Sequence, residues 1–417
     1  MTLLLTICLL SQPLTLTLEK AVEMALKRSP VLQQSYYSKQ ISTFSLINST
    51  GDLLASASIT GNYTNFDYFS DQSALFINSP EYYTINAGIE TKAFSPTALW
   101  NVLNAYNNRI ISILQYEYTR NQLIFQVKSE YLNALRNKHL LEVSKKALER
   151  AELYYRLTKE KLALGSATKL DLLKAEVQMK KAKLDILNAE RAYKTSLYNL
   201  LKLIGFGLKS EVLLEDVQIV DTMIYLPPLR EVEEMALKYN HTLKEVKTQY
   251  NNKKIDLAYD FLSIIPSVSF GYYWNYGGSD RPSSINTFSD KRGWSISLSF
   301  NLLSYPINIL NGYYYKKQKE AYYKTTLFEV IKNVRDAYME LKNSLESLSL
   351  SKSSLQQAKE AYNLAKEQYA LGKISILDLL DVEESLKTSE VSYIETIYNL
   401  EIAKEKLNFQ TGMEVIK

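Results

Sequence analysis

The sequence predicts an α+β membrane protein in which three identical chains form a twelve-stranded transmembrane β-barrel, continued by an α-helical coiled-coil barrel of twelve helices. Three observations predict this fold. The chain repeats itself with a period of about 210 residues, each copy holds helical stretches far too long for a compact core, and each copy holds two strand-like segments with one apolar face.

The internal repeat covers nearly the whole chain. The sequence Met24 to Lys27 recurs without change as Met235 to Lys238. Ala163-Leu164-Gly165 recurs as Ala370-Leu371-Gly372, and in both copies Leu-Asp-Leu-Leu begins five residues after the glycine. Such self-similarity indicates that one structural unit has been duplicated.

A short apolar run, Leu3 to Leu10, lies at the start of the chain and is too short to cross a bilayer as a helix. We expect residues 1–17 to be a secretory signal peptide. Because Cys8 is the only cysteine, disulfides within the chain and thiolate metal sites are excluded. A lipid anchor on Cys8 is an alternative role for this residue. No other stretch reaches the roughly 18 apolar residues of a membrane helix, so a membrane protein with this sequence has to span as strands.

Each copy is expected to begin with a leading helix, at residues 18–54 and 229–265. Helical hairpins are expected at residues 96–228, with an equatorial segment, and at residues 306–417. Their return arms carry apolar residues every seven positions, which is the pattern of a coiled-coil seam. These residues are Leu172, Met179, Ile186, Tyr193 and Leu200 in the first copy, and Leu379, Leu386, Tyr393, Leu400 and Leu407 in the second.

The descending arms, Thr97 to Leu164 and Ile307 to Leu371, contain no proline and only one glycine, Gly312. At about 1.5 Å per residue each would be roughly 100 Å long. Because the return arms are about half that length, the leading helices are expected to cover the rest.

Between these helices, in residues 55–95 and 266–305, the apolar period changes to two. Val268, Phe270 and Tyr272, for example, alternate with small or polar residues. Strands of about 10 residues with one apolar and one small polar face are typical of a membrane barrel with a wet lumen. An antiparallel sheet with one face on a soluble core is the alternative.

The segments that flank the strands fit a barrel. Ser70 to Glu81 and Gly277 to Gly293 are polar, and we expect them to be hairpin tips that face the outside. Pro96 and Pro306 follow the second strand of each pair, where the chain changes direction.

Counting strands predicts the oligomer. Membrane barrels have no open edges and need at least about 8 strands, so four strands per chain are too few. Two chains would give eight strands and an interior filled by side chains, whereas three would leave a duct. A homotrimer is therefore expected.

The sequence lacks the motifs that are typical of other functional classes. The 49 basic and 45 acidic residues are interspersed, which argues against nucleic-acid binding. His139 and His241 stand far apart without a ligand cluster, and neither a phosphate-binding loop nor a nucleophile elbow is present. We expect no enzyme activity, no metal site and no cofactor.

The chain resembles the TolC-like outer-membrane efflux proteins. The resemblance lies in the opening Leu16-x-x-Glu19-x-Ala21-x-x-x-Ala25-Leu26 with Ser29-Pro30, and in the paired turns Ala163 to Leu173 and Tyr369 to Leu380. It implies a passive duct in the outer membrane with a periplasmic helical domain. A periplasmic adaptor and an inner-membrane transporter would open it, in an efflux or a type I secretion system. A soluble or periplasmic coiled-coil scaffold or adaptor is the alternative from another class.

The resemblance also implies site residues. Adaptor docking would fall on the hairpin turns, at Gly165, Ser166, Thr168, Gly372, Lys373 and Ser375. Asp378 and Asp381 match the acidic rings of the entrance, which would favour cations and raise some carboxyl pKa values by crowding. From the residues alone, an acid in the first turn of a helix is also explained as a surface residue that interacts with the helix dipole.

Asp171 and Tyr369 match a latch that holds the entrance closed, while Ile374 stands where the family has a basic residue. We expect Asp171→Ala or Tyr369→Phe to raise single-channel conductance in planar bilayers, because each removes one half of the link. An unchanged conductance would remove the latch assignment.

Overall fold

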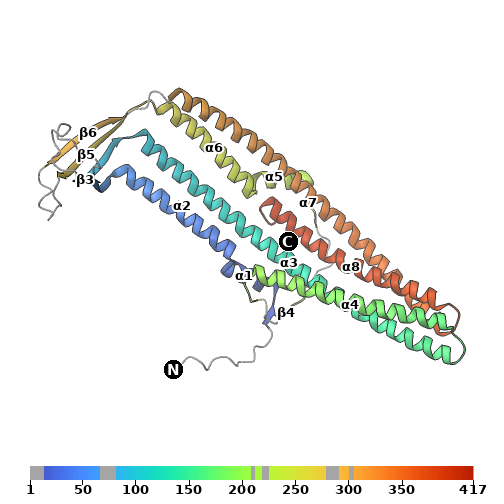
Figure 1. Cartoon of the computed structure of the whole chain (residues 1–417). Helices are drawn as coiled ribbons and strands as arrows, with labels where there is room; N and C mark the ends of the chain where they lie inside the picture. Colours follow the sequence, from blue (N-terminus) through green and yellow to red (C-terminus); the bar gives the residue numbers. More distant parts are fainter. Residues whose placement is uncertain are drawn as a thin grey trace, which may run out of the picture. The chain divides into compact units, whose positions relative to one another are not determined.

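The computed structural model describes residues 14–65, 81–207, 212–217, 225–278, 291–299 and 305–416 (Figure 1). Two compact units divide the chain. A sheet unit comprises Ser35–Tyr116 and Thr242–Thr326, and a hairpin unit comprises Met1–Gln34, Glu117–His241 and Leu327–Lys417. Each unit is described by itself.

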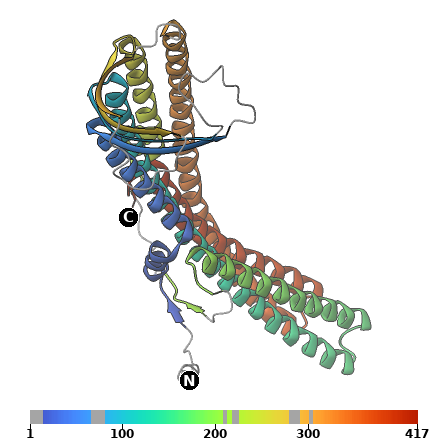
Figure 2. The same cartoon turned by 60° about the vertical axis from the view of Figure 1, so that its left-hand side comes forward.

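The sheet unit contains one four-stranded antiparallel sheet in the order β2-β3-β5-β6. Its strands are β2 (Ser56–Asn65), β3 (Glu81–Phe94), β5 (Ser267–Gly278) and β6 (Lys291–Ser299). Each strand begins where the helical period gives way to alternation, so most of the large apolar side chains fall on one side of the pleat. Figure 2 shows that the sheet is strongly curved.

Register places the apolar residues of all four strands on one face. Ile59 lies opposite Ala87, which lies opposite Trp274, and Phe270 lies opposite Ile296. The other face carries Ser58, Thr60, Asn86, Gly88, Ser269, Asn275, Ser295 and Ser297. Ile59 is 80% exposed and Trp294 is 75% exposed, so the apolar face of a single chain is uncovered.

Helices continue from this sheet in pairs. Helix α2 (Pro30–Leu54) lies beside the start of α3 (Pro96–Ala163), where Arg109 Nε donates to Thr43 Oγ1 at 3.3 Å (Figure 1). Helix α6 (His241–Leu262) lies beside the start of α7 (Tyr305–Ala370), where Lys319 Nζ donates to Gln249 Oε1 at 2.9 Å. At 68 residues, α3 is about 100 Å long.

Each leading helix, expected to be continuous, is broken. Helix α1 (Leu18–Arg28) ends at Ser29, which is extended because the residue before a proline avoids helical geometry. Helix α5 (Leu229–Tyr239) ends at Asn240, whose side-chain amide donates to the Gln410 carbonyl at 2.8 Å. Gly412 packs against this break at φ +77°, and a Cβ there would lie 2.6 Å from the Tyr239 carbonyl oxygen. Tertiary contacts therefore fix the second break.

The hairpin unit contains two helical hairpins and a small parallel strand pair. The C-terminal part of α3 runs back into α4 (Lys169–Leu203), and that of α7 runs back into α8 (Ile376–Thr411). Figures 1 and 2 show the two hairpins side by side with their turns at the same end. In the seven-residue seams Leu172, Leu200, Leu379, Leu386, Leu400 and Leu407 are buried.

The strand pair joins β1 (Leu14–Leu16) to β4 (Val212–Leu214). The buried hydroxyl of Tyr131 lies 2.7 Å from the carbonyl oxygens of both Leu16 and Glu215. Leu14 to Leu16 thus pair with the segment that follows α4. The signal-peptide boundary at residue 17 stays a prediction.

Some predicted segments fall elsewhere than expected. Glu81 at one tip, and Gly277, Gly278 and residues 291–293 at the other, belong to strands, so the strands are longer than the alternation indicated. The rest of both tips, and residues 1–13 with Cys8, lie outside the described residues. In the described part of the chain, no helix combines the length and apolarity needed to cross a membrane.

Candidate functional site

The two hairpin turns share one geometry. Helix α3 ends in a Schellman motif in which Ser166 N donates to the Lys161 carbonyl at 2.8 Å and Gly165 N donates to that of Leu162 at 3.0 Å. The second turn repeats both bonds through Lys373 and Gly372. Both glycines have φ +73°, and a Cβ on either would meet no described atom within 4 Å. Backbone conformation alone therefore requires glycine at these turns.

A capping box then starts each return helix. Thr168 Oγ1 accepts a hydrogen bond from Asp171 N, while the Asp171 carboxylate accepts from Thr168 N at 2.9 Å and from Thr168 Oγ1 at 2.7 Å. Ser375 and Asp378 repeat this arrangement at 3.0 and 2.7 Å. Both turns are thus closed by their own backbone and side chains.

Hydrogen bonds to the ionised form hold the pKa values of both capping carboxyls below their usual range. The bond from the hydroxyl of Thr168 or Ser375 lowers the pKa of Asp171 or Asp378 most, and the backbone N–H adds to it. This stabilisation is present above the ordinary aspartate pKa and is lost as pH falls through the lowered value. At neutral pH both residues are anionic.

Asp378 and Asp381 lie on the solvent side of α8. They are three residues apart and share one face of the helix, whereas Ile376 and Leu379 are buried on another. Lys373 is exposed at the turn, and Ile374 packs against a buried cluster beside it. Both acids are therefore exposed to solvent in the single chain, and their place in a ring stays a prediction.

Tyr369 is only 5% exposed and has partners other than Asp171. Its hydroxyl lies 3.0 Å from Thr158 Oγ1 of α3, and Lys161 Nζ lies 4.1 Å from its ring centroid and donates to its carbonyl at 2.7 Å. Because the Asp171 carboxylate bonds Thr168, these contacts do not join the two latch residues. The latch therefore stays a prediction.

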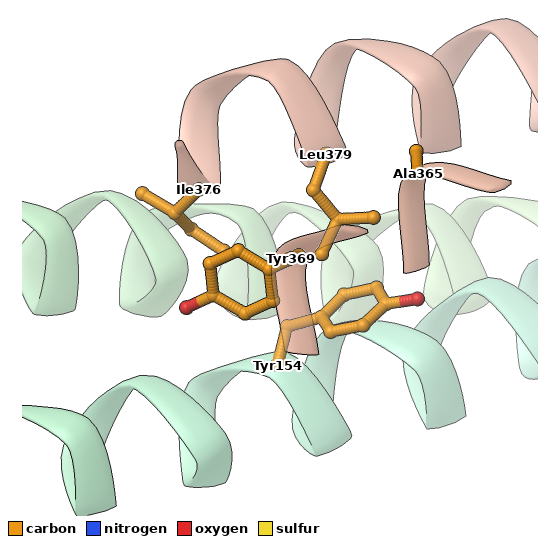
Figure 3. Packing of buried hydrophobic residues seen from close by; sticks show 5 residues of the cluster. All are labelled: Tyr154, Ala365, Tyr369, Ile376 and Leu379. Carbon is orange, nitrogen blue, oxygen red and sulfur yellow. The ribbon is translucent and has the colours of Figure 1, made fainter. Parts of the chain in front are cut away.

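The cluster around Tyr369 joins the two hairpins of one chain. Tyr154 from α3 packs against Ala365 and Tyr369 from α7 and against Ile376 and Leu379 from α8 (Figure 3). The Tyr154 hydroxyl forms a short hydrogen bond with that of Tyr362. Burial raises the pKa of Tyr154, so its hydroxyl stays neutral.

A buried ion network continues from this cluster. Arg150 Nε donates to Glu383 Oε1 at 3.1 Å, and Nη2 donates to Glu390 Oε2 at 3.2 Å, which ties α3 to α8. The side chain of Glu383 is 2% exposed. Burial raises the pKa of its carboxyl, and the hydrogen bond and charge of Arg150 offset only part of that rise.

The sequence analysis assigned no role to Arg150 or to Glu383. Its counterpart in the first copy, Glu176, pairs with Lys180 along its own helix at 2.8 Å and is partly exposed. Gln357 stands where Arg150 would recur. This difference between the two copies is visible in the sequence but does not by itself locate a partner, because Arg156 also lacks a counterpart, at Asn363, and is exposed.

The histidines have carboxylate neighbours that the sequence did not reveal. His139 lies 3.3 Å from both Glu142 and Asp216, and His241 lies 3.7 Å from Glu117. Across the residues that the structure covers, no group of three or more His, Cys, Asp or Glu side chains could hold a metal ion.

Comparison with models of known protein families identifies a match. The sequence model of the outer membrane efflux protein family matches residues 53–206 and 263–413. No curated protein matches the chain significantly.

Solved channel structures share the fold. The CmeC outer-membrane channel of Campylobacter jejuni superimposes with a TM-score of 0.80 at 17% identity, over 95% of this chain and 86% of that one. The open-state MtrE channel of Neisseria gonorrhoeae gives 0.76 at 16%, over 95% and 89%. VceC of Vibrio cholerae gives 0.74 at 15%, over 95% and 96%. At these identities the likeness establishes the fold.

The buried network predicts a charge-dependent stability. Arg150→Met leaves the Glu383 carboxylate buried without its partner, and we expect a loss of about 3–5 kcal/mol at neutral pH. Because the pKa of Glu383 is already raised, the folded state holds its proton more tightly than the unfolded chain. The loss should therefore shrink as pH falls and the carboxyl is protonated. The measurement is the midpoint of thermal unfolding at fixed protein concentration.

Two further variants control this experiment. Arg150→Met combined with Glu383→Gln should recover much of the loss, since no unpaired charge then remains. Arg156→Met, at an exposed arginine of the same helix, should change stability by less than about 0.5 kcal/mol. Equal effects of the two arginine variants would show that the network contributes nothing specific.

Proposed function

Because the chain belongs to the outer membrane efflux protein family, we propose that it is a passive exit duct, formed by a homotrimer whose β-barrel lies in outer-membrane lipid. Its helical domain lies in the periplasm. A periplasmic adaptor and an inner-membrane transporter, in a tripartite efflux or type I secretion system, open it. The family consists of channels rather than enzymes.

The uncovered apolar face of the sheet carries this proposal. Ile59, Phe270, Trp294 and Ile296 are all about half exposed or more, although they share a face with one another. A soluble monomer rarely leaves a contiguous apolar surface of this kind uncovered. Lipid on this side and water on the serine-rich side account for both faces.

The edges of the sheet support a trimer. Within the described sheet β2 and β6 each pair on one side only. In lipid, every backbone polar group needs a partner, so both edges have to be joined to strands of other chains. Three copies of this sheet close a ring of twelve strands.

A polar groove supports an aqueous lumen. It lies between α2 and α3 and is lined by Ser38, Ser42, Ser45, Ser49, Asn101, Asn104 and Asn108. Lys92 belongs to both this groove and the polar face of the sheet, where it lies opposite Ser269. The serine–asparagine groove would thus continue the lumen from the barrel into the helices.

We place the entrance at the hairpin turns. The adaptor would dock on the turn residues Gly165, Ser166, Thr168, Gly372, Lys373 and Ser375. Their shape is fixed by hydrogen bonds within each turn. Asp378 and Asp381 would form the cation-favouring ring. Asp171 and Tyr369 would form the latch in the closed assembly, in competition with the bond between Tyr369 and Thr158.

A matched pair of lysine substitutions tests the barrel. Ile296→Lys places a charge on the apolar face of β6, which costs about 2–4 kcal/mol near the middle of a bilayer. We expect it to remove the protein from the outer-membrane fraction of a bacterial host and to abolish the trimer seen by native mass spectrometry. Ser297→Lys, its neighbour on the polar face, should be tolerated. Equal effects, or a water-soluble monomeric wild type, would favour the coiled-coil scaffold instead.

The acidic ring predicts ion selectivity. Because Asp378 also caps α8, Asp381→Asn is the cleaner variant, and removing three charges per trimer should reduce cation preference. The measurement is the reversal potential in planar bilayers under a salt gradient. Asp336→Asn, at an exposed acid paired with Lys332 on α7, is the matched control. A reversal potential that Asp381→Asn leaves unchanged would exclude Asp381 from the ring.

A further inference from the structure

An apolar groove lies between α3 and α6 in the sheet unit. Its cavity of about 300 Å³ is at the lower end of the range for small-molecule sites. The lining is almost wholly hydrocarbon and aromatic, and it includes Phe94, Leu99, Trp100 and Leu103 on one side and Ala258 and Tyr259 on the other.

Two aromatic residues in the groove have polar atoms that are already bonded. The rings of Trp100 and Tyr259 stack with centroids 5.0 Å apart. Trp100 Nε1 donates to Asp256 Oδ1 at 3.0 Å, and the Tyr259 hydroxyl lies 2.9 Å from Thr97 Oγ1. Since these bonds satisfy the polar atoms, the rings offer the groove only apolar surface. Aromatic residues of this kind gather where a membrane meets water.

Phe94 connects the groove to the apolar face of the sheet. A bulge between Lys92 and Phe94 shifts the register, so that Phe94 lies opposite Val268, which lies opposite Leu298. The apolar face therefore continues from the strands into the groove without interruption.

The residues of α3 that line the polar groove indicate which way the apolar groove faces. Asn101, Asn104 and Asn108 line the serine–asparagine groove, whereas Leu99, Trp100 and Leu103 line the apolar groove. At 100° per residue the centres of these two sets lie about 125° apart around the helix, so the two grooves open toward different sides of α3. If the polar groove faces the lumen, the apolar groove faces lipid.

We propose that this groove binds an acyl chain of a phospholipid from the periplasmic leaflet. The site rests on the proposed function, since it needs the sheet to lie in a bilayer. The chain would enter past Phe94, lie between α3 and α6, and contact the ring of Trp100.

Quenching by brominated phospholipids tests the site. The chain has three tryptophans, so Trp274→Phe with Trp294→Phe leaves only Trp100, and Trp100→Phe with Trp274→Phe leaves only Trp294. Both proteins are reconstituted as full-length trimers into phosphatidylcholine vesicles with bromines on the acyl chains. We expect Trp100 emission to fall to an extent comparable with that of Trp294.

Filling the groove provides the specific control. Ala258 is exposed in the groove, so Ala258→Phe should fit without disturbing the core, should relieve the quenching of Trp100 and should leave that of Trp294 unchanged. Ala105→Phe, the same change on the polar side of α3, should alter neither.

The outcomes separate the two proposals. Quenching of Trp294 without quenching of Trp100 overturns the lipid site and indicates that a neighbouring copy or water covers the groove. Absence of quenching at both tryptophans overturns the membrane sheet itself. Quenching of Trp100 that Ala258→Phe leaves intact also overturns the groove, because the lipid then contacts the ring from elsewhere.

Discussion

The alternation of side chains along four strands is the constraint on which the rest of the structure depends. It collects the apolar residues on one face and the serines, asparagines and glycines on the other. The first turns of α3 continue both faces, through Phe94 into an apolar groove and through Lys92 into a polar one. A register slip of one residue would exchange the two environments along the whole path. In the proposed duct, side-chain alternation in the sheet would thus decide which side of α3 meets water.

The two copies of the repeat keep one turn and differ in their interiors. Gly165 and Gly372 have the same backbone angle, and Asp171 and Asp378 close identical capping boxes. Behind the turns, Glu383 is buried against Arg150 while Glu176 reaches only along its own helix. Local backbone requirements preserved the turns in both copies. The packing of α3 against α8 buries the charge of Glu383, whereas its counterpart Glu176 stays partly exposed.

The sequence predicted those features that depend on local periodicity. Alternation located the strands, the seven-residue seam located the buried side of α4 and α8, and the glycines marked both helix ends. It did not locate β1 and β4, whose three residues each are too short for any period. The break at Asn240 depends on Gln410 and Gly412, which are distant in sequence. Tyr369 was assigned to a polar link, but its burial depends on which helix packs beside it.

The hydrogen bonds that close the hairpin turns are all local, and this affects the order in which parts of the chain fold. Every bond that closes a turn, from Lys161 to Asp171 and from Gln368 to Asp378, joins residues at most five apart. Such contacts carry little loop-closure entropy and form early, on the timescale of helix formation. Each newly made chain can therefore complete its hairpin tips early, while the sheet, whose β3 and β5 are far apart in sequence, forms later.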